Sequence, residues 1–194
     1  MAPGRCSESL AGRIAYQELT GFTPLEINKL SEQDKLWLRG GFPDSFLAQT
    51  DLASLRWRLN FTSTYLERDV PQFDPRIPAT TLRTLWTMLA HNQGGQLNIA
   101  QLGANLDLSA PIVKRYIDLL VNLLLVRTLR PWSGNVGKRL VKAPKVYIRD
   151  SGLTHALLNL TSLDDVLSHP VVGGSWEGFV MDNLLTSLPV GLTP

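Results

Sequence analysis

The spacing of apolar side chains predicts a chain of short helices with one β-hairpin. Apolar positions recur near helical spacing over 52–69, with Arg58 among the polar side chains of that segment, and again over 81–91. Asn98 carries a helix-start signal that predicts a short helix over 99–106. The segment from 110 to about 125 is the most regular, with an apolar face and a polar, partly cationic face.

Closer to the N-terminus, the pattern is less regular and favours short elements. The run from Arg13 to Leu19 predicts a brief strand. Thr23 and Glu26 form a capping-box pattern with proline between them at the first helical position. Pro43 begins another short helical piece after a pair of glycines. These signals predict a small helical subdomain.

Two short runs of alternating apolar residues follow the third helix of the second half. They cover 126–129 and 145–149, and a Gly- and Lys-rich span separates them. Three helices followed by a β-hairpin is the order of a winged helix. Beyond the hairpin, Asp150 is expected to cap a short helix over 153–158, and a last amphipathic helix is expected around 176–185.

Composition places the chain among globular proteins. Of its 194 residues, 44% are hydrophobic and 19% are charged, which suits a chain with a buried core. Cys6 is the only cysteine, so no internal disulfide can form and a reducing, cytoplasmic setting is favoured. The longest apolar run is too short to cross a bilayer, and we expect no membrane partner.

Charge is unevenly distributed along the chain. Residues 111–149 hold nine basic side chains and one acidic one, a net charge of +8, whereas the rest of the chain holds ten basic and sixteen acidic ones, a net charge of −6. This asymmetry indicates a surface that faces a polyanion such as DNA. A solvated charged face without a partner is the alternative.

The winged-helix pattern selects five candidate DNA-binding residues within this basic segment. Two lie on the polar face of the third helix and three in the hairpin, and they are Lys114, Arg115, Lys138, Arg139 and Lys142. Contacts from the hairpin would be mostly sequence-independent and sensitive to salt. Winged helices also act as protein-interaction modules, so contact with a protein partner is the other hypothesis.

Signatures of catalysis are missing from the sequence. His91, His155 and His169 have no metal-ligand spacing with one another or with Cys6. The Gly94–Gly95 pair lacks the lysine that a phosphate-binding loop needs. We therefore expect no catalytic residue, no metal and no cofactor in this chain.

The order of several short motifs adds a resemblance. LWLRGGFPDSFL is followed by TYLERDVPQ, by KAPKVYIRDSGL and by GGSWEGFVMDNLL. From Ser7 to about Leu185, the chain resembles the C-terminal portion of bacterial and archaeal ATPases. Those proteins join an N-terminal AAA-type, signal-transducing-like ATPase domain to a C-terminal domain of unknown function, family number 4143. The Walker A and Walker B region of such proteins is absent from this chain.

The resemblance implies a fold class and a division into domains. The class is mainly α with a small β component: a helical ATPase lid remnant, a winged helix, and the start of a restriction-endonuclease-like α/β domain. The implied parts are the end of the ATPase core with its lid over 1–70, a linker over 71–80, the winged helix with its wing over 81–149, and a truncated nuclease-like start over 150–194.

The resemblance also implies roles for a few residues. Gly41 and Pro43 match an element that packs near the adenine of a bound nucleotide, although a helix C-cap followed by a proline start explains both residues equally well. Glu177 matches a glutamate that precedes the metal-binding strand of family members. Alone it cannot hold a catalytic metal, so it is more simply a surface or capping residue.

Together these observations predict a partial ATP-binding protein that acts as a winged-helix module for nucleic acid or protein. This chain is expected to have neither ATPase nor nuclease activity, and ATP and Mg²⁺ are expected only in full-length relatives. Its expected partners are DNA, a protein, or the missing ATPase portion. The alternative is a free-standing winged-helix transcriptional regulator or a protein-interaction module.

Overall fold

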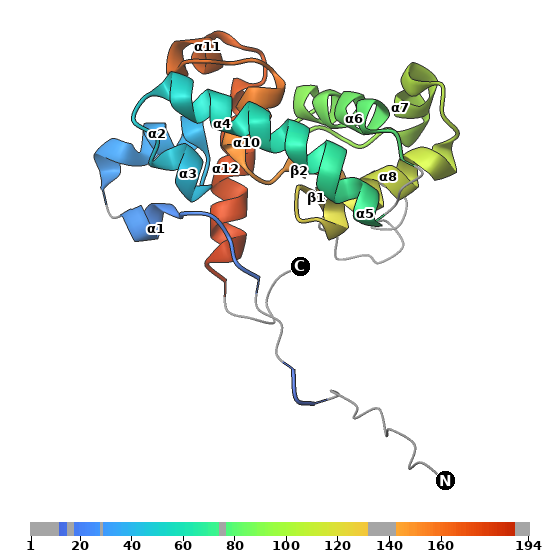
Figure 1. Cartoon of the computed structure of the whole chain (residues 1–194), viewed down its shortest axis with the longest axis horizontal. Coiled ribbons are helices and arrows are strands. Elements are labelled where there is room, and N and C mark those ends of the chain that lie inside the picture. The colour runs from blue at the N-terminus through green and yellow to red at the C-terminus, as the bar shows by residue number, and fades with distance from the viewer. Residues whose placement is uncertain (1–11, 15–17, 28, 74–76, 132–142, 189–194) are drawn as a thin grey trace.

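The computed structural model describes residues 12–14, 18–27, 29–73, 77–131 and 143–188. These residues are mainly helical and include one small antiparallel sheet, as predicted (Figure 1). The N-terminal elements are α1 (Pro24–Ile27), η1 (Leu30–Glu32), α2 (Gln33–Arg39), α3 (Pro43–Phe46), α4 (Asp51–Thr64), the π-helical turn η2 (Tyr65–Asp69) and α5 (Val70–Phe73). The later elements are α6 (Ala79–His91), α7 (Ile99–Leu106), α8 (Ala110–Asn122), β1 (Val126–Leu129), β2 (Lys145–Ile148), α10 (Ser151–Leu157), α11 (Leu163–Ser168) and α12 (Val172–Thr186).

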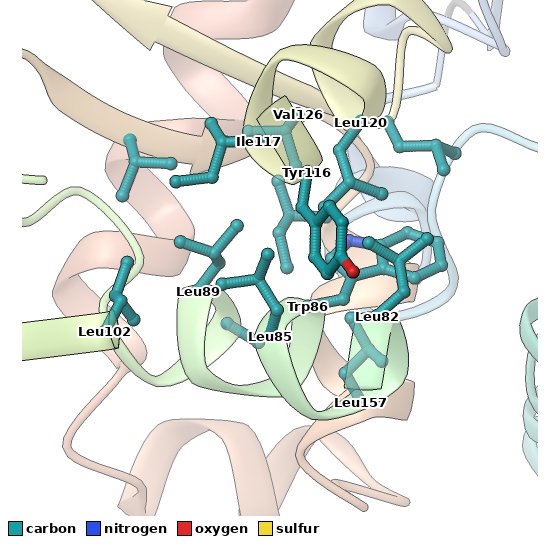
Figure 2. Packing of buried hydrophobic residues seen from close by; sticks show 14 of the residues in the cluster. Leu82, Leu85, Trp86, Leu89, Leu102, Tyr116, Ile117, Leu120, Val126 and Leu157 are labelled. Atoms are coloured by element: carbon teal, nitrogen blue, oxygen red, sulfur yellow. The ribbon is translucent and has the colours of Figure 1, made fainter. Parts of the chain in front are cut away.

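Helices α6, α7 and α8 pack with the two strands around the larger hydrophobic core (Figure 2). Four side chains of α6 line it at helical spacing, and they are Leu82, Leu85, Trp86 and Leu89. Strands β1 and β2 are antiparallel, with Val126 opposite Ile148 and Thr128 opposite Val146. These four residues belong to one face of the hairpin, because alternate strand residues point the same way. Gln96 adds a bridge to Lys145 at the outer edge of β2.

A second, smaller core lies between α2, α3, α11 and α12. Its buried members are Leu36, Trp37, Leu38, Phe46, Leu160, Val166, Val171 and Phe179. Helix α10 joins the two cores, because it packs against α2, α4, α6 and α12 and all seven of its residues are buried. Helix α10 therefore links the hairpin to the helices of the N-terminal part.

Local signals located most elements correctly. The helix over 99–106 begins at the Asn98 cap, whose side chain accepts a hydrogen bond from the backbone of Gln101, and both strands lie at the predicted positions. The third helix is shorter than predicted and ends at Asn122. Leu124, two residues beyond the end of this helix, has a left-handed φ of 59°, which turns the chain into β1.

Two other N-terminal expectations can be compared with the structure. The predicted strand over 13–19 is not seen at residues 13–14 or 18–19, the part of it that the structure describes. Helix α5 occupies the first residues of the predicted 71–80 linker. None of the helices in the described part is long and apolar enough to cross a membrane.

Candidate functional site

A cavity of about 400 Å³ lies beside the turn between α2 and α3. Its size is within the range of small-molecule sites. Its walls come from segment 18–23, from η2 and α4, from the turn after α8, from the start of α10 and from α12. Gly41 and Pro43, the two residues that the resemblance associates with a nucleotide, both line it.

The turn itself has the geometry of a helix end followed by a helix start. Gly40 is the C-cap of α2 with a left-handed φ of 77°, and Pro43 occupies the first turn of α3. The backbone nitrogen of Gly41 donates to Oδ2 of Asp150 at 2.8 Å, and its carbonyl accepts from the nitrogen of Phe22 at 2.7 Å. The turn is thus fixed from both sides, and its glycines have a packing role whether or not a ligand binds.

Two sequence motifs meet at this turn. A Cβ on Gly40 would overlap the carboxylate of Asp150, and a Cβ on Gly152 would overlap the carbonyl of Arg39. The GGFP motif at the end of α2 and the RDSGL motif at the start of α10 are therefore complementary surfaces of one junction. Asp150 also caps α10, as predicted, by accepting a hydrogen bond from the nitrogen of Leu153 at 2.8 Å.

Aromatic rings form one wall of the cavity. Trp57, Phe61 and Tyr65 follow one another at helical spacing, with ring centroids 5.3 and 5.4 Å apart and interplanar angles of 14° and 21°. Phe42 lies 5.0 Å from Phe61. Phe42, Phe61 and Tyr65 all line the cavity. Tyr65 begins the π-helical turn η2, a distortion that is frequent at functional sites.

Charged side chains also line the cavity, and they are Glu18, Arg149, Asp150 and Asp182. Asp182 of α12 pairs with two guanidinium groups, Arg127 at 3.0 Å and Arg149 at 3.3 Å, and Arg149 also pairs with Glu18. The carboxylate of Asp150 adjoins this group, but its two oxygens are taken by backbone N–H groups. Burial raises the pKa of Asp150, while those two N–H groups and Arg58 act in the opposite direction.

A buried polar cluster supports the junction from behind. Arg58 of α4 is fully buried and donates to the carbonyls of Leu38 and Gly152 at 3.1 and 2.7 Å. Burial lowers its pKa to about 10. The sequence pattern placed Arg58 among the polar side chains of its helix, and this interpretation is wrong because Arg58 is buried, with acceptors in the last turn of α2 and the first turn of α10.

His155 continues this cluster toward α12. Its Nδ1 lies 3.0 Å from the carbonyl of Leu38 and its Nε2 lies 2.8 Å from Oγ of Ser175. A carbonyl only accepts, so Nδ1 carries the proton and Nε2 accepts from Ser175. Ser175 in turn accepts from Nε1 of Trp37 at 3.0 Å. The neutral ring satisfies every partner, and burial lowers its pKa to about 4.

The candidate DNA-binding residues are only partly described. Lys114 and Arg115 are exposed on α8, as predicted, and Lys114 pairs with Asp118 at 2.6 Å on the same face. Lys138, Arg139 and Lys142 lie outside the described residues. The structure therefore places two of the five predicted cations on one helix face and leaves the hairpin group untested.

Helix α12 neutralises part of the basic segment. Glu177 accepts from Lys145 at 2.7 Å and from the hydroxyl of Tyr147 at 2.9 Å. These bonds lower the pKa of Glu177 and raise that of Lys145. Glu177 is thus a docking residue between α12 and β2. Sequence reasoning missed this contact because the acidic partners follow the hairpin by many residues and no local signal pairs them.

Histidines and carboxylates do not form a metal-binding cluster within the described ranges. No group of three His, Cys, Asp or Glu side chains that could hold a metal ion occurs there. His91 and His169 approach each other, with ring centroids 6.4 Å apart, and His155 is buried in the α10 cluster.

Comparison with known proteins identifies the family. The model described as "Domain of unknown function (DUF8612)" matches residues 30–164. The chain belongs to the DUF8612 family. The match takes in the GGFP turn, helices α6 to α8, the hairpin and α10. The resemblance predicted a domain of unknown function, and the matching family is one, but it is DUF8612 where the resemblance named family number 4143. An ATPase origin remains a proposal.

Two longer curated proteins are similar to this DUF8612 chain. They are the uncharacterized proteins Rv2008c of Mycobacterium tuberculosis and Mb2031c of Mycobacterium bovis, each 46% identical over 185 residues. The matched region covers 95% of this chain but only 42% of each relative. No solved structure matches the chain.

Proposed function

We propose that this DUF8612 chain is a binding module whose winged-helix unit contacts nucleic acid. The observation that carries the proposal is the order α6, α7, α8, β1, β2, together with the bridge from Gln96 to Lys145. A winged helix has this order, with an additional short strand beside the last strand of the hairpin. In that arrangement α8 is the recognition helix.

The exposed face of α8 supports contact with a polyanion. Lys114 and Arg115 lie on it, and Asn122 adds a polar amide one turn beyond Asp118. The ion pair between Lys114 and Asp118 is exposed on both sides, so a phosphate can replace the carboxylate at little cost. Lys138, Arg139 and Lys142, which lie outside the described residues, are the other cations of the proposal.

Binding to a protein is the second candidate. It is favoured by the ion pairs between the hairpin and α12, because Arg127, Lys145 and Arg149 are already paired with acidic side chains. The cationic surface is therefore smaller than the net charge of +8 suggests. An exposed apolar residue on α8, Ile112, would suit a protein partner.

A nucleotide site is the third part of the proposal, and it concerns longer relatives of this chain. The shared lining of the cavity by Gly41 and Pro43 supports it. We propose that the N-terminal helices are the lid of an AAA-type ATP-binding protein and that the chain after the hairpin begins a nuclease-like domain. For this chain alone we propose neither ATP hydrolysis nor nuclease activity, and we propose ATP with Mg²⁺ only for full-length relatives.

Fluorescence anisotropy with a labelled DNA duplex tests the nucleic-acid proposal. Affinity should fall steeply as salt rises, and the variant Lys114→Glu with Arg115→Glu should bind more weakly and with a shallower salt slope. Lys29→Glu, an exposed lysine of the N-terminal part, is the matched control and should bind like the natural chain.

A second variant examines the hairpin. Lys138→Glu with Arg139→Glu should reduce affinity in the same assay if the hairpin is part of the surface. If neither charge reversal changes binding, α8 and the hairpin are not the DNA surface and the proposal fails. A stable complex with a protein partner, lost in the α8 variant while DNA binding is absent, would favour the second candidate.

A further inference from the structure

The charge cluster at the cavity has one cation more than it has anions until Glu18 is counted, and of its members Arg149 and Asp182 line the cavity whereas Arg127 does not. Arg127 and Arg149 share the single carboxylate of Asp182, so this group of three carries one unit of positive charge. Arg58 and Asp150 carry opposite charges close enough for each to affect the pKa of the other. Glu18 supplies the missing negative charge by pairing with Arg149.

Glu18 differs from the other members of this group in exposure. Its side chain is 45% exposed, whereas those of Arg149 and Asp182 are 10% and 19% exposed. It belongs to segment 18–23, which is fixed at its other end, where Phe22 bonds to Gly41 and its ring packs edge-on against Phe46. A partly exposed ion pair contributes little, so another anion can take the place of Glu18.

The remaining walls suit a flat ring. Phe42, Phe61 and Tyr65 present aromatic rings, and aromatic groups pack favourably face to face with an offset or edge to face. Gly21 and Gly41 bring two backbone segments together so closely that neither has room for a Cβ. Their bare peptide planes provide a further flat surface within the same lining.

We propose that this cavity binds a flat aromatic ligand with one anionic group, a phosphate or a carboxylate, that pairs with Arg149 in place of Glu18. The ring lies against the aromatic wall of Phe42, Phe61 and Tyr65. The guanidinium of Arg149 pairs with the anion of the ligand, and it pairs with the carboxylate of Glu18 when the ligand is absent. This inference takes its location from the nucleotide part of the proposed function and is independent of DNA binding.

Isothermal titration with two matched pairs of compounds tests this proposal. The first pair is AMP and adenosine, which differ in a phosphate, and the second is nicotinate and nicotinamide, which differ in a carboxylate. The anionic member of at least one pair should bind more tightly. Glu18→Gln removes the internal competitor and should tighten that compound by about fivefold, the value of one exposed ion pair, without changing its neutral counterpart.

Two further variants complete the design. Asp34→Asn changes an exposed carboxylate of α2 that does not line the cavity, and it should leave all four affinities unchanged. Arg149→Gln should abolish the preference for the anionic compound, with a thermal melt to verify that the variant is folded. If that variant does not fold, the response to Glu18→Gln still decides the question.

Each outcome has one meaning. Equal binding within both pairs, unaffected by Glu18→Gln, overturns the assignment of Arg149 while the nucleotide location stands if AMP and adenosine bind. Preference for nicotinate alone supports the inference with a carboxylate as the anion. Absence of binding by all four compounds overturns the inference, whereas the nucleotide part of the proposed function concerns longer relatives and is decided by nucleotide binding to such a protein.

Discussion

Protonation of His155 should destabilise the protein between pH 6.5 and pH 4. An unperturbed histidine has a pKa of 6.5, and in the folded protein burial lowers that of His155 to about 4. Below pH 6.5 the unfolded chain gains a proton at this ring that the folded protein does not accept. Stability therefore decreases as the pH falls, and the loss reaches its limit below the folded pKa.

The two pKa values determine the size of the effect. From linkage, the free energy of unfolding should fall by about 2 kcal/mol between pH 7.5 and pH 5, and by about 3 kcal/mol at pH 4. The cause is burial of the ring, and the hydrogen bonds leave no acceptor for a second proton. A second ring proton on Nε2 would face Ser175, whose hydroxyl already donates to that nitrogen.

Urea unfolding at pH 7.5, 6 and 5 measures this loss. His155→Gln should lower stability at pH 7.5 and flatten the pH dependence, whereas His91→Gln changes an exposed histidine and should leave the pH dependence as it is. Should His155→Gln fail to fold, the NMR shift of the ring in the natural chain gives the titration directly. A ring that titrates near pH 6.5, or a midpoint equal at pH 7.5 and pH 5, would refute the reasoning.

Two further predictions use pairs of matched substitutions in the same unfolding assay. Gly152→Ala should destabilise by about 3 kcal/mol or more because its Cβ overlaps the carbonyl of Arg39, whereas Gly173→Ala, with no heavy atom within 4 Å of the new Cβ, should gain up to about 1 kcal/mol of helix propensity. Leu89→Ala opens a cavity in the larger core and should cost about 2–5 kcal/mol, whereas Leu184→Ala at a 64% exposed position should change stability by about 0.5 kcal/mol or less. Equal effects within either pair would contradict the packing described above.

Sequence reasoning succeeded where structure depends on neighbours in the chain. Asn98 and Asp150 cap the helices that their positions predicted, because capping requires only a polar side chain and a backbone N–H three residues later. The strands of the hairpin were located for the same reason, since alternation along a few residues defines them. The mainly helical fold class and the small sheet could be predicted from these local rules.

Contacts between residues far apart in the sequence could not be predicted from it. The pattern around α4 could not show that Arg58 is buried, because its acceptors, the carbonyls of Leu38 and Gly152, come from two other helices. Net charge suggested a broad cationic surface, yet Glu177 and Asp182 approach it only after the chain has folded back. The two candidate nucleotide residues were identified from a resemblance, and the aromatic wall beside them came from the structure alone.

The cavity and the hairpin are joined by consecutive residues of the chain. Arg149 and Asp150 directly follow β2, and both line the cavity while Asp150 holds the Gly41 turn and caps α10. The same strand pairs with β1, which leads back to α8. A ligand that displaced Glu18 from Arg149 would therefore act on the last residues of the hairpin. If the cavity and α8 both bind their proposed partners, the turn after α8 connects the two sites more directly, because Leu123, Leu124 and Leu125 line the cavity themselves.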